Sequence, residues 1–305
     1  MNTQVAVIGG GPAGITAGIY AARAGLKVAI CEKNIYGGQT SIIDNIENYP
    51  GIAKISGVDF SNALYEQCTR FGVEFVFGDV IKAELKNDKK VLYLSDGKSI
   101  EAKAVIIANG LQRRTLGCKG EKEFSGKGVS YCATCDGAFF KGKKVAVVGG
   151  GNTALEDALY LANICEKVTL IVRKNYFRGE KYLVEAVNKT PNIGVMFESN
   201  IKEIKGTKSV ESALLSVLGK EDVCLAVDGV FIAIGYKPEN EIYATDIDVD
   251  ESGYFVSGED CKTKVDGVFV AGDCRKKPLR QIATAVSDGA VCGNSAAKFV
   301  FGSEF

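Results

Sequence analysis

Histidine is missing from this sequence of 305 residues. Its absence excludes Ser-His and Cys-His nucleophile pairs, histidine bases and histidine ligands for a metal. Any proton transfer must therefore use Asp, Glu, Lys, Tyr, Cys or water. A second CxxC, which a cysteine-bound zinc would usually require, is missing as well, so we expect no metal site.

Neither an excess of charge nor a long apolar run is present. Lys and Arg number 37, as do Asp and Glu, so the formal net charge is zero. A dedicated nucleic-acid-binding protein would usually be strongly basic. No apolar run approaches the roughly 18 residues that span a membrane, and the opening Met-Asn-Thr-Gln does not resemble a signal peptide. We expect a cytoplasmic protein that binds neither nucleic acid nor membrane.

Glycine is abundant instead, with 36 residues that cluster after apolar runs. Residues 5–8 form such a run, which leads into Gly-Gly-Gly-Pro-Ala-Gly at 9–14 and then into a helical pattern at 15–25. A second apolar run follows at 27–32. This order of strand, glycine turn, helix and strand is the context that a dinucleotide-binding fingerprint requires.

The same order occurs a second time. The apolar run 144–148 leads into Gly-Gly-Gly-Asn-Thr-Ala at 149–154, a helical stretch at 155–162 and a strand at 168–172. The three glycine positions make the turn, let the backbone approach a diphosphate and let helix and strand pack closely. The diphosphate would lie at the positive end of the helix. The predicted binding positions of the two turns are Gly9, Gly11, Pro12, Ala13 and Gly14, and Gly149, Gly151, Asn152, Thr153 and Ala154.

The residue that closes the second strand distinguishes the two nucleotides. In the first unit it is Glu32, an acceptor suited to the ribose diol of FAD or NAD. The second unit has no acid there and presents a basic cluster: Arg173 and Lys174, which follow Val172, and then Arg178. This cluster predicts a 2′-phosphate, and so NADP(H); a solvated strand end with ordinary surface charge is the alternative.

Of the ten cysteines, Cys132 and Cys135 form a CxxC pair. This spacing lowers the pKa of one thiol and permits a reversible disulfide. Asp136 follows directly and is the nearest candidate acid or base. The alternatives are a structural dithiol and a turn-capping role for Asp136. Most of the other cysteines lie among apolar residues, which indicates small buried side chains.

Across nearly its whole length the sequence resembles the low-molecular-weight thioredoxin reductases. The specific segment is Cys-Ala-Thr-Cys-Asp-Gly at 132–137, inside the second nucleotide-binding unit. There are further matching segments, several of which recur in flavoprotein disulfide reductases generally. They are the two glycine turns, Gly-Gly-Gln at 37–39, Glu-Asn-Tyr-Pro-Gly at 47–51, Ile-Ala-Asn-Gly at 107–110, Phe-Ile-Ala-Ile-Gly at 231–235, Gly-Val-Phe-Val-Ala-Gly-Asp at 267–273 and Arg-Gln at 280–281.

The resemblance implies an α/β fold of two Rossmann-like three-layer nucleotide-binding domains, with the second inserted in the first. Residues 1–112 and 244–305 would form the FAD-binding domain. Residues 113–243 would form an NADPH-binding-type domain that carries the CxxC motif. Members of this family rotate one domain against the other and usually work as homodimers, so we expect a homodimer.

The resemblance also implies the course of the electrons. They would pass from nicotinamide to flavin, then to the Cys132–Cys135 disulfide, and the dithiol would reduce thioredoxin. Cys135 would lie nearest the flavin, with Asp136 as proton donor or acceptor. Asp273 would meet the ribityl and phosphate region of the flavin, and Gln281 and Ile282 its ring. The further positions expected to contact FAD are Lys33, Gly38, Gln39, Asn48, Ala108, Asn109, Gly110 and Arg280.

The sequence departs from the family at the phosphate-binding signature. The family has His-Arg-Arg-x-x-x-Arg, whereas this chain has Val172, Arg173, Lys174 and, after three residues, Arg178. Valine cannot donate to a phosphate, and lysine lacks the planar fork of arginine. One lost charged hydrogen bond costs about 1.5–3 kcal/mol. Asn109 also stands where the family more often has threonine.

These departures leave a second electron donor open. Some similar enzymes of anaerobes take electrons from reduced ferredoxin, an acidic protein. The run Arg275-Lys276-Lys277 would be a docking patch for it, or else an ordinary solvated loop. We favour NADPH.

Other function classes fit less well. A glutathione-reductase-like enzyme would carry its redox cysteines in the FAD domain and use a catalytic histidine, and a ferredoxin–NADP reductase would lack the CxxC. A flavin dithiol oxidase shares FAD and the CxxC and is only weakly excluded. A non-catalytic flavoprotein that docks thioredoxin would need neither thiol.

Overall fold

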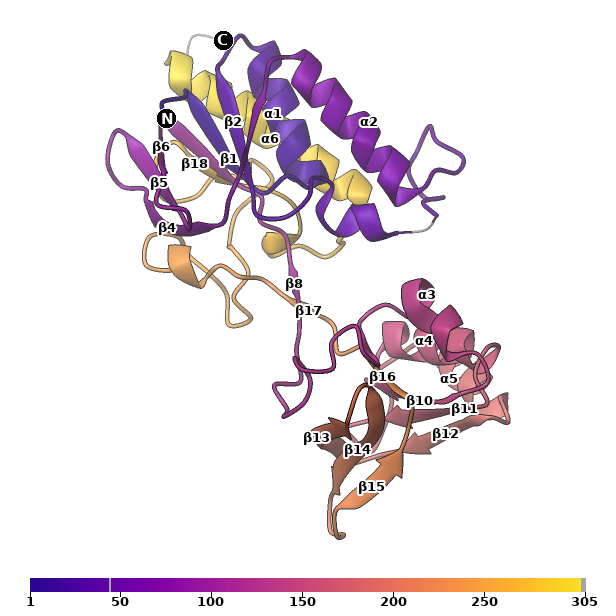
Figure 1. Cartoon of the computed structure of the whole chain (residues 1–305). Helices are drawn as coiled ribbons and strands as arrows, with labels where there is room; N and C mark the ends of the chain where they lie inside the picture. Colours follow the sequence, from indigo (N-terminus) through magenta and orange to yellow (C-terminus); the bar gives the residue numbers. More distant parts are fainter. Residues whose placement is uncertain (44, 303–305) are drawn as a thin grey trace. The chain divides into compact units, whose positions relative to one another are not determined.

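The computed structural model describes residues 1–43 and 45–302. The chain divides into two compact units (Figure 1). Unit 1 comprises Met1–Gln112 and Lys237–Phe305, and unit 2 comprises Arg113–Tyr236. Among the described residues, no helix combines the length and the apolar character needed to cross a membrane.

The centre of unit 1 is a five-stranded parallel sheet in the order β18-β7-β1-β2-β3. Every residue of β1, β2, β7 and β18 is buried, as expected where both faces of a parallel sheet are covered. The bounds are β1 Val5–Ile8, β2 Val28–Glu32, β3 Glu74–Phe77, β7 Ala104–Ile107 and β18 Val268–Val270.

Helices and a second sheet cover the two faces of this layer (Figure 1). Val5 and Val7 point to the helices α1, α2 and α6, whereas Ala6 and Ile8 point to the antiparallel sheet β4-β5-β6. This alternation follows from the two-residue period of a strand. The bounds are α1 Pro12–Arg23, α2 Gly57–Arg70, α6 Ile282–Phe301, β4 Val80–Glu84, β5 Lys90–Leu94 and β6 Ser99–Ala102, with short 3₁₀ turns η1 Gly38–Ile42, η3 Glu241–Tyr243 and η4 Gly272–Cys274.

Unit 2 repeats the same three layers. Its parallel sheet has the order β12-β11-β10-β16-β9. Val145 and Val147 face the helices, and Ala146 and Val148 face the antiparallel sheet β13-β14-β15. The bounds are β9 Val129–Ser130, α3 Ala133–Asp136, η2 Gly137–Phe140, β10 Lys144–Val148, α4 Asn152–Ala162, β11 Lys167–Ile171, α5 Lys181–Lys189, β12 Ile193–Met196, β13 Ser199–Gly206, β14 Val210–Val217, β15 Val223–Ala226 and β16 Gly229–Ile232. The predicted α/β class with two Rossmann-like domains is therefore confirmed.

The chain leaves unit 1 through β8 Gln112–Arg113 and returns through β17 Tyr236–Lys237. Residues 237–243, which the family resemblance assigned to the insert, lie in unit 1. The reason is local packing: Tyr243 is buried in the core of unit 1, and the Asn240 side-chain amide donates to the carbonyls of Gly253 and Cys274.

Two glycines of α6 let this helix lie directly against α1. A Cβ on Gly289 would collide with the carbonyl of Ala13 and lie 2.9 Å from Cβ of Thr16. A Cβ on Gly293 would meet the carbonyl of Ala17. Because backbone atoms cannot move aside as a side chain can, the first turns of α1 depend on these missing side chains.

We predict that Gly289→Ala lowers the free energy of unfolding, because overpacking alone costs about 1–3 kcal/mol and a collision with backbone lies toward the upper end of this range. The helix propensity gained by alanine, about 1 kcal/mol, offsets part of this cost. Gly194→Ala in β12 is the matched control, because a Cβ there meets nothing within 4 Å. Urea unfolding of the two variants checks this; equal midpoints would contradict it.

Candidate functional site

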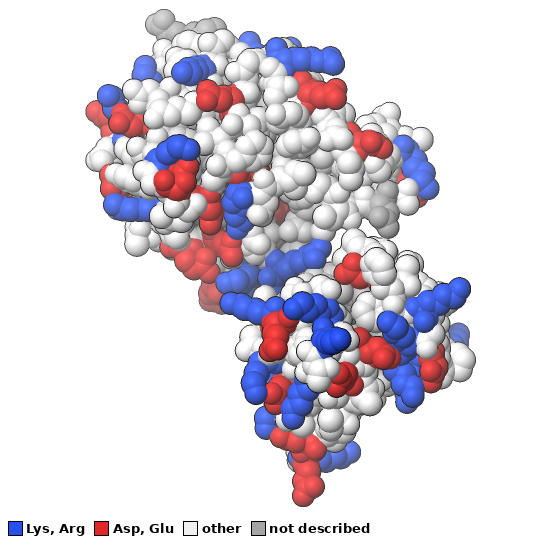
Figure 2. Space-filling view, in the orientation of Figure 1, with Lys and Arg blue, Asp and Glu red and all other residues white. Residues whose placement is uncertain are grey.

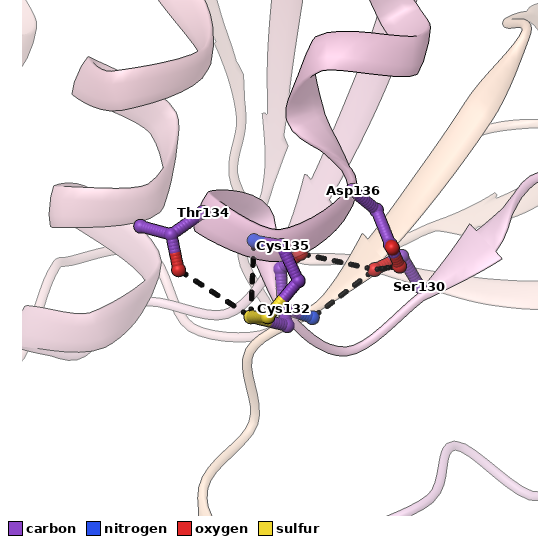
Figure 3. Close-up of a disulfide and its surroundings, with 5 residues drawn as sticks. All are labelled: Ser130, Cys132, Thr134, Cys135 and Asp136. Carbon is purple, nitrogen blue, oxygen red and sulfur yellow. Dashed lines mark hydrogen bonds between the residues drawn. A yellow bond between two sulfur atoms is a disulfide. The ribbon is translucent and has the colours of Figure 1, made fainter. Parts of the chain in front are cut away.

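A disulfide joins Cys132 and Cys135 across the first turn of α3 (Figure 3). Their Cα atoms are 5.3 Å apart, within the range that a disulfide requires. Cys132 has extended backbone and is the N-cap of the helix, which places its side chain over the first turn. Cys135, three residues on, returns to the same side of the turn. The predicted CxxC pair is thus closed into a disulfide in unit 2.

The two sulfur atoms have different surroundings. Cys132 Sγ lies 3.2 Å from the backbone nitrogen of Cys135 and 3.4 Å from the hydroxyl of Thr134. Among the hydrogen bonds of the described residues, none involves Cys135 Sγ, and Cys135 is exposed where Cys132 is half-buried. Donors directed at a sulfur stabilise its thiolate. After reduction, the negative charge would therefore be favoured on Cys132.

Asp136 is held by Ser130 rather than by the helix backbone. Its Oδ2 lies 2.6 Å from Ser130 Oγ, which is itself 3.1 Å from the backbone nitrogen of Cys132. Asp136 makes no capping hydrogen bond to the following 3₁₀ turn. The alternative of a turn-capping aspartate is therefore not what the structure contains. The carboxyl group remains half-buried beside the disulfide.

A second network fixes the segment that precedes the disulfide. The Tyr131 hydroxyl donates to Glu121 Oε1 at 2.8 Å, and the same carboxylate accepts the backbone N–H groups of Leu116 and Gly117. Burial raises the pKa of Tyr131, and its hydrogen bond to Glu121 raises it further. Neither residue was predicted from sequence, because an interaction across ten positions of loop leaves no periodic signal.

Asp157 of α4 is a further ionisable group that sequence reasoning missed. Burial raises its pKa to about 6, and the charge of Glu156 adds to the shift, while Arg113 opposes it. A carboxyl group that titrates near neutrality is a candidate for proton handling. Its position on the helix that follows the second glycine turn is the only clue that the sequence offers.

The first glycine turn leaves its backbone open. Gly11 is the N-cap of α1 without a side-chain cap, and Pro12 occupies the first helical position. A Cβ on Gly11 would meet nothing within 4 Å, whereas one on Gly14 would collide with the carbonyl of Gly9. Ala13 lies in the same buried first turn of the helix. The free N–H groups of this turn are what a diphosphate binds.

Glu32 ends β2 beside this turn and is 7% exposed. One carboxylate oxygen accepts the N–H of Gly10 at 2.7 Å and the other accepts that of Asn34 at 2.8 Å. Each oxygen keeps an acceptor site. The buried carboxylate can therefore also receive hydroxyl groups of a ribose.

The second glycine turn has the same construction. Gly151 is the N-cap of α4, again without a side-chain cap, and a Cβ on it would meet nothing within 4 Å. A Cβ on Gly149 would lie 2.8 Å from that of Ala154. The Asn152 amide donates to Glu180 at 3.0 Å, and Thr153 is exposed.

The basic cluster beside this turn is exposed, whereas the neighbouring Val172 is buried. Val172 is 3% exposed and packs in the core of unit 2. Arg173, Lys174 and Arg178 are all exposed. Lys174 Nζ donates to the hydroxyl of Tyr176 at 2.8 Å. On the face in view, basic and acidic side chains are interspersed over both units (Figure 2).

Several of the other predicted positions of unit 1 come together in space. Gly38 lies beside Gly11, and Ala108 lies beside Gly9. The Asn48 amide donates to Gln281 at 3.0 Å, although 233 positions separate them. Gln281 is also the N-cap of α6, so that Ile282 begins this helix. The remaining contacts are Lys33 with Glu239 at 3.0 Å, Gln39 with the carbonyl of Leu111 at 3.4 Å, and Arg280 with the carbonyls of Asp273 and Arg275. A Cβ on Gly110 would meet no atom within 4 Å.

Three buried oxygen atoms of unit 1 lack hydrogen-bond partners among the described residues: Ser61 Oγ and, at two of the predicted flavin-contacting positions, Asp273 Oδ1 and Asn109 Oδ1. Burial raises the pKa of Asp273, against the opposing charges of Lys277 and Arg280. An unpartnered buried acceptor costs free energy, which a ligand with hydroxyl groups would recover. The hydroxyl-bearing ribityl chain of a flavin nucleotide has the groups that these two oxygens need.

The run at residues 275–277, for which the sequence left open a ferredoxin-docking patch or a solvated loop, is mostly buried. Arg275 is 4% exposed and its guanidinium lies 2.7 Å from Asp288. Lys277 is largely buried and lies 2.8 Å from the same carboxylate. Only Lys276 is exposed. Two of the three charges are therefore neutralised inside unit 1.

Comparisons with known proteins agree with this geometry. Residues 3–289 match the family model described as pyridine nucleotide-disulphide oxidoreductase. A thioredoxin reductase of Peptoclostridium acidaminophilum is 41% identical over 97% of this chain and 96% of its own length. The thioredoxin reductase of Bacillus subtilis is 39% identical, covering 97% of this chain and 94% of its own.

The chain belongs to the low-molecular-weight thioredoxin reductase family.

Solved structures of the same family align over nearly the whole chain. A thioredoxin reductase of Lactococcus lactis aligns with a TM-score of 0.85 at 38% identity, covering 98% of this chain and 99% of that one. A ferredoxin-flavin thioredoxin reductase of Clostridium acetobutylicum aligns with a TM-score of 0.54 at 27% identity, covering 98% of both chains. The predicted family resemblance is thus confirmed, and the chain is a member of a family of flavin-dependent oxidoreductases.

The raised pKa of Asp157 predicts a pH-dependent stability. The folded state keeps this proton up to about pH 6, whereas the unfolded chain loses it near 3.8, the ordinary pKa of an aspartate. Stability therefore falls as pH rises through this window, and the cost persists above it. We expect Asp157→Asn to be more stable than the wild type above pH 6, on the order of 1–3 kcal/mol, with the difference shrinking toward pH 4.

Urea unfolding between pH 4 and pH 8 measures this difference. Glu185→Gln on α5 is the control, because Glu185 is exposed and pairs only loosely with Lys181 at 3.9 Å. Its difference from the wild type should be small and independent of pH. A difference for Asp157→Asn that is equally flat would show that the buried carboxyl does not titrate in this window.

Proposed function

We propose that this protein reduces the disulfide of thioredoxin with electrons from NADPH. The observation that carries the proposal is the Cys132–Cys135 disulfide, which lies in the unit that repeats the nucleotide-binding fold and has its second cysteine exposed. Asp136 stands beside it as an acid or base. A structural disulfide would not require an adjoining carboxyl group or an accessible sulfur.

Unit 1 is proposed to hold FAD, which when bound supplies a two-electron carrier between the donor and the disulfide. The glycine turn before α1 would bind its diphosphate and Glu32 a ribose. Asp273 and Asn109 offer their unpartnered oxygens to its hydroxyl groups. The predicted contacts of Gln281 and Ile282 with the flavin ring rest on the family resemblance.

Unit 2 is proposed to bind NADPH at the turn before α4. Arg173, Lys174 and Arg178 are exposed next to this turn and would pair with the 2′-phosphate. Val172 contributes no donor, so the affinity would rest on the three basic residues. Ferredoxin is the alternative donor, but two of the three basic residues that would dock it are buried against Asp288, and the ferredoxin-dependent relative is the less similar one at 27% identity.

The environment of the two sulfurs supports a division of labour. Cys132, whose sulfur receives two hydrogen bonds, would attack the thioredoxin disulfide as a thiolate. Cys135 would face the flavin and later close the disulfide again. Phe139, four residues after Cys135 in the following 3₁₀ turn, is 74% exposed and would offer an apolar contact to the partner. We also propose a homodimer, as is usual in this family.

Replacing Cys135 tests the function directly. Cys135→Ser leaves one thiol, so the disulfide cannot re-form and thioredoxin reduction should fall to background, while the yellow flavin colour is retained. Cys224→Ser is the control, because Cys224 is a free and exposed cysteine of the same unit. The readout is the number of thiols formed in oxidised thioredoxin. Turnover that persists in Cys135→Ser would refute the proposed mechanism.

The electron donor is tested by anaerobic titration of the protein with NADPH, NADH and reduced ferredoxin in turn. We expect the flavin absorbance to bleach with NADPH. Arg173→Ala should raise the half-saturating NADPH concentration roughly 10- to 150-fold, because one charged hydrogen bond is lost. Lys189→Ala, an exposed charge at the end of α5, should leave it unchanged. Bleaching by ferredoxin alone would favour the ferredoxin-dependent alternative.

A further inference from the structure

A buried hydroxyl group connects Asp136 to the backbone of the redox-active pair. Ser130 ends β9 and is 4% exposed. Its Oγ lies 2.6 Å from Asp136 Oδ2, 3.1 Å from the backbone nitrogen of Cys132 and 3.2 Å from the carbonyl oxygen of Cys132 (Figure 3). Three polar groups thus converge on one oxygen atom beside the disulfide.

The hydroxyl of Ser130 has one proton and two acceptor sites. The N–H of Cys132 donates to Oγ and occupies one of these sites. The single proton of the hydroxyl then has two acceptors within reach, Asp136 Oδ2 and the carbonyl of Cys132. Which of them receives it depends on the charge of Asp136.

Both protonation states of Asp136 are satisfied by this arrangement. When the carboxyl is ionised, Ser130 donates to Oδ2, and a distance of 2.6 Å is typical of a hydroxyl that donates to a carboxylate. When the carboxyl carries a proton, it donates that proton to Ser130 Oγ, and Ser130 turns its own proton to the carbonyl of Cys132. In neither state is a buried polar atom left without a partner, so neither state bears that cost.

We propose that Ser130 is a positioning residue that lets Asp136 take up and release a proton next to the Cys132–Cys135 pair. This role rests on the proposed reduction of thioredoxin. Ser130 contacts no sulfur in a hydrogen bond, and acts by holding the carboxyl group in place through both states. An alanine there would leave the carboxyl and the N–H of Cys132 without this partner.

The proton balance of the reaction shows where the exchange is needed. Asp136 first takes the proton of the Cys132 thiol, and the resulting thiolate attacks a thioredoxin sulfur, so that the thioredoxin S–S bond breaks. The first thioredoxin thiolate takes that proton from Asp136. Asp136 next takes the proton of Cys135, whose sulfur attacks Cys132 Sγ; the second thioredoxin thiolate leaves and takes this proton from Asp136. Two electrons pass to thioredoxin, the enzyme disulfide re-forms, and Ser130 keeps its own proton.

The experiment compares kcat and KM for thioredoxin in the wild type, Ser130→Ala, Asp136→Asn and the double variant. We expect Ser130→Ala to lower kcat by about 10- to 100-fold, part of the usual contribution of a general acid–base group. The KM for thioredoxin should change less than about twofold, because no contact with the partner is removed. In the Asp136→Asn background, the serine substitution should add less than about a twofold loss, because the two residues act as one unit.

Ser199→Ala is the matched control. Ser199 lies in the same unit, is 1% exposed and donates to the carbonyl of Phe197 at 2.8 Å. This hydrogen bond involves neither Asp136 nor the cysteine pair. It should show the same flavin content and melting temperature as Ser130→Ala, but the kcat of the wild type. Ser130→Thr, which keeps a hydroxyl on the same Cβ, should restore kcat to within about threefold of the wild type.

The outcomes separate the two proposals. If the wild type and Ser199→Ala do not reduce thioredoxin, the proposed function fails and the role of Ser130 fails with it. If they do, and Ser130→Ala keeps its kcat, only the role of Ser130 is overturned. Losses that multiply in the double variant, or a threonine variant as slow as the alanine variant, also overturn that role.

Discussion

The structure depends on two parallel sheets that are covered on both faces. Every residue of β1 and β16 is buried, and each strand is hydrogen-bonded to a neighbour in its own sheet, β1 to β7 and β16 to β10. Neither the faces of these sheets nor the paired edges of their inner strands can reach a ligand. Chemistry is therefore confined to the loops at the ends of the strands, where helices begin with unpaired N–H groups. This is where the two glycine turns and the disulfide lie.

The two units use equivalent places in their sheets for different tasks. β18 occupies one edge of the first sheet and leads into the turn that carries Asp273. β9 occupies the corresponding edge of the second sheet and leads into α3 with its disulfide. β18 is the last strand of its unit and β9 is the first, so the equivalence is one of position in the sheet and not of order along the chain.

Local patterns predicted the two nucleotide-binding units and the redox-active cysteine pair, whereas the inserted-domain arrangement and the electron path came from the family resemblance. The apolar runs before the glycine turns predicted β1 and β10. The charge of the residues at the end of the next strand predicted the ligand of each turn: a ribose for Glu32 and a 2′-phosphate for the basic cluster. Local patterns could not predict individual side-chain contacts. The hydrogen bond of Asn48 with Gln281 joins distant segments, and that of Ser130 with Asp136 closes a turn; neither leaves a periodic signal in the sequence. The run at 275–277 misled for the same reason. Arg275 and Lys277 form ion pairs with Asp288. Asp288 lies on α6, more than ten residues further along the chain, so the sequence of the run does not reveal this partner.

The burial of Val172 bears on how such an enzyme could change its electron donor. A Cβ on Gly150 would lie 2.9 Å from a methyl group of Val172, so this valine fills space under the second glycine turn as well as replacing a polar residue. A histidine introduced alone would have to turn outward to meet a phosphate and would leave that space empty, at the cost of a cavity. The substitution is thus coupled to its neighbours in the core. Evolution, or an engineer, would have to repack the underside of the turn before a stronger phosphate ligand became an advantage.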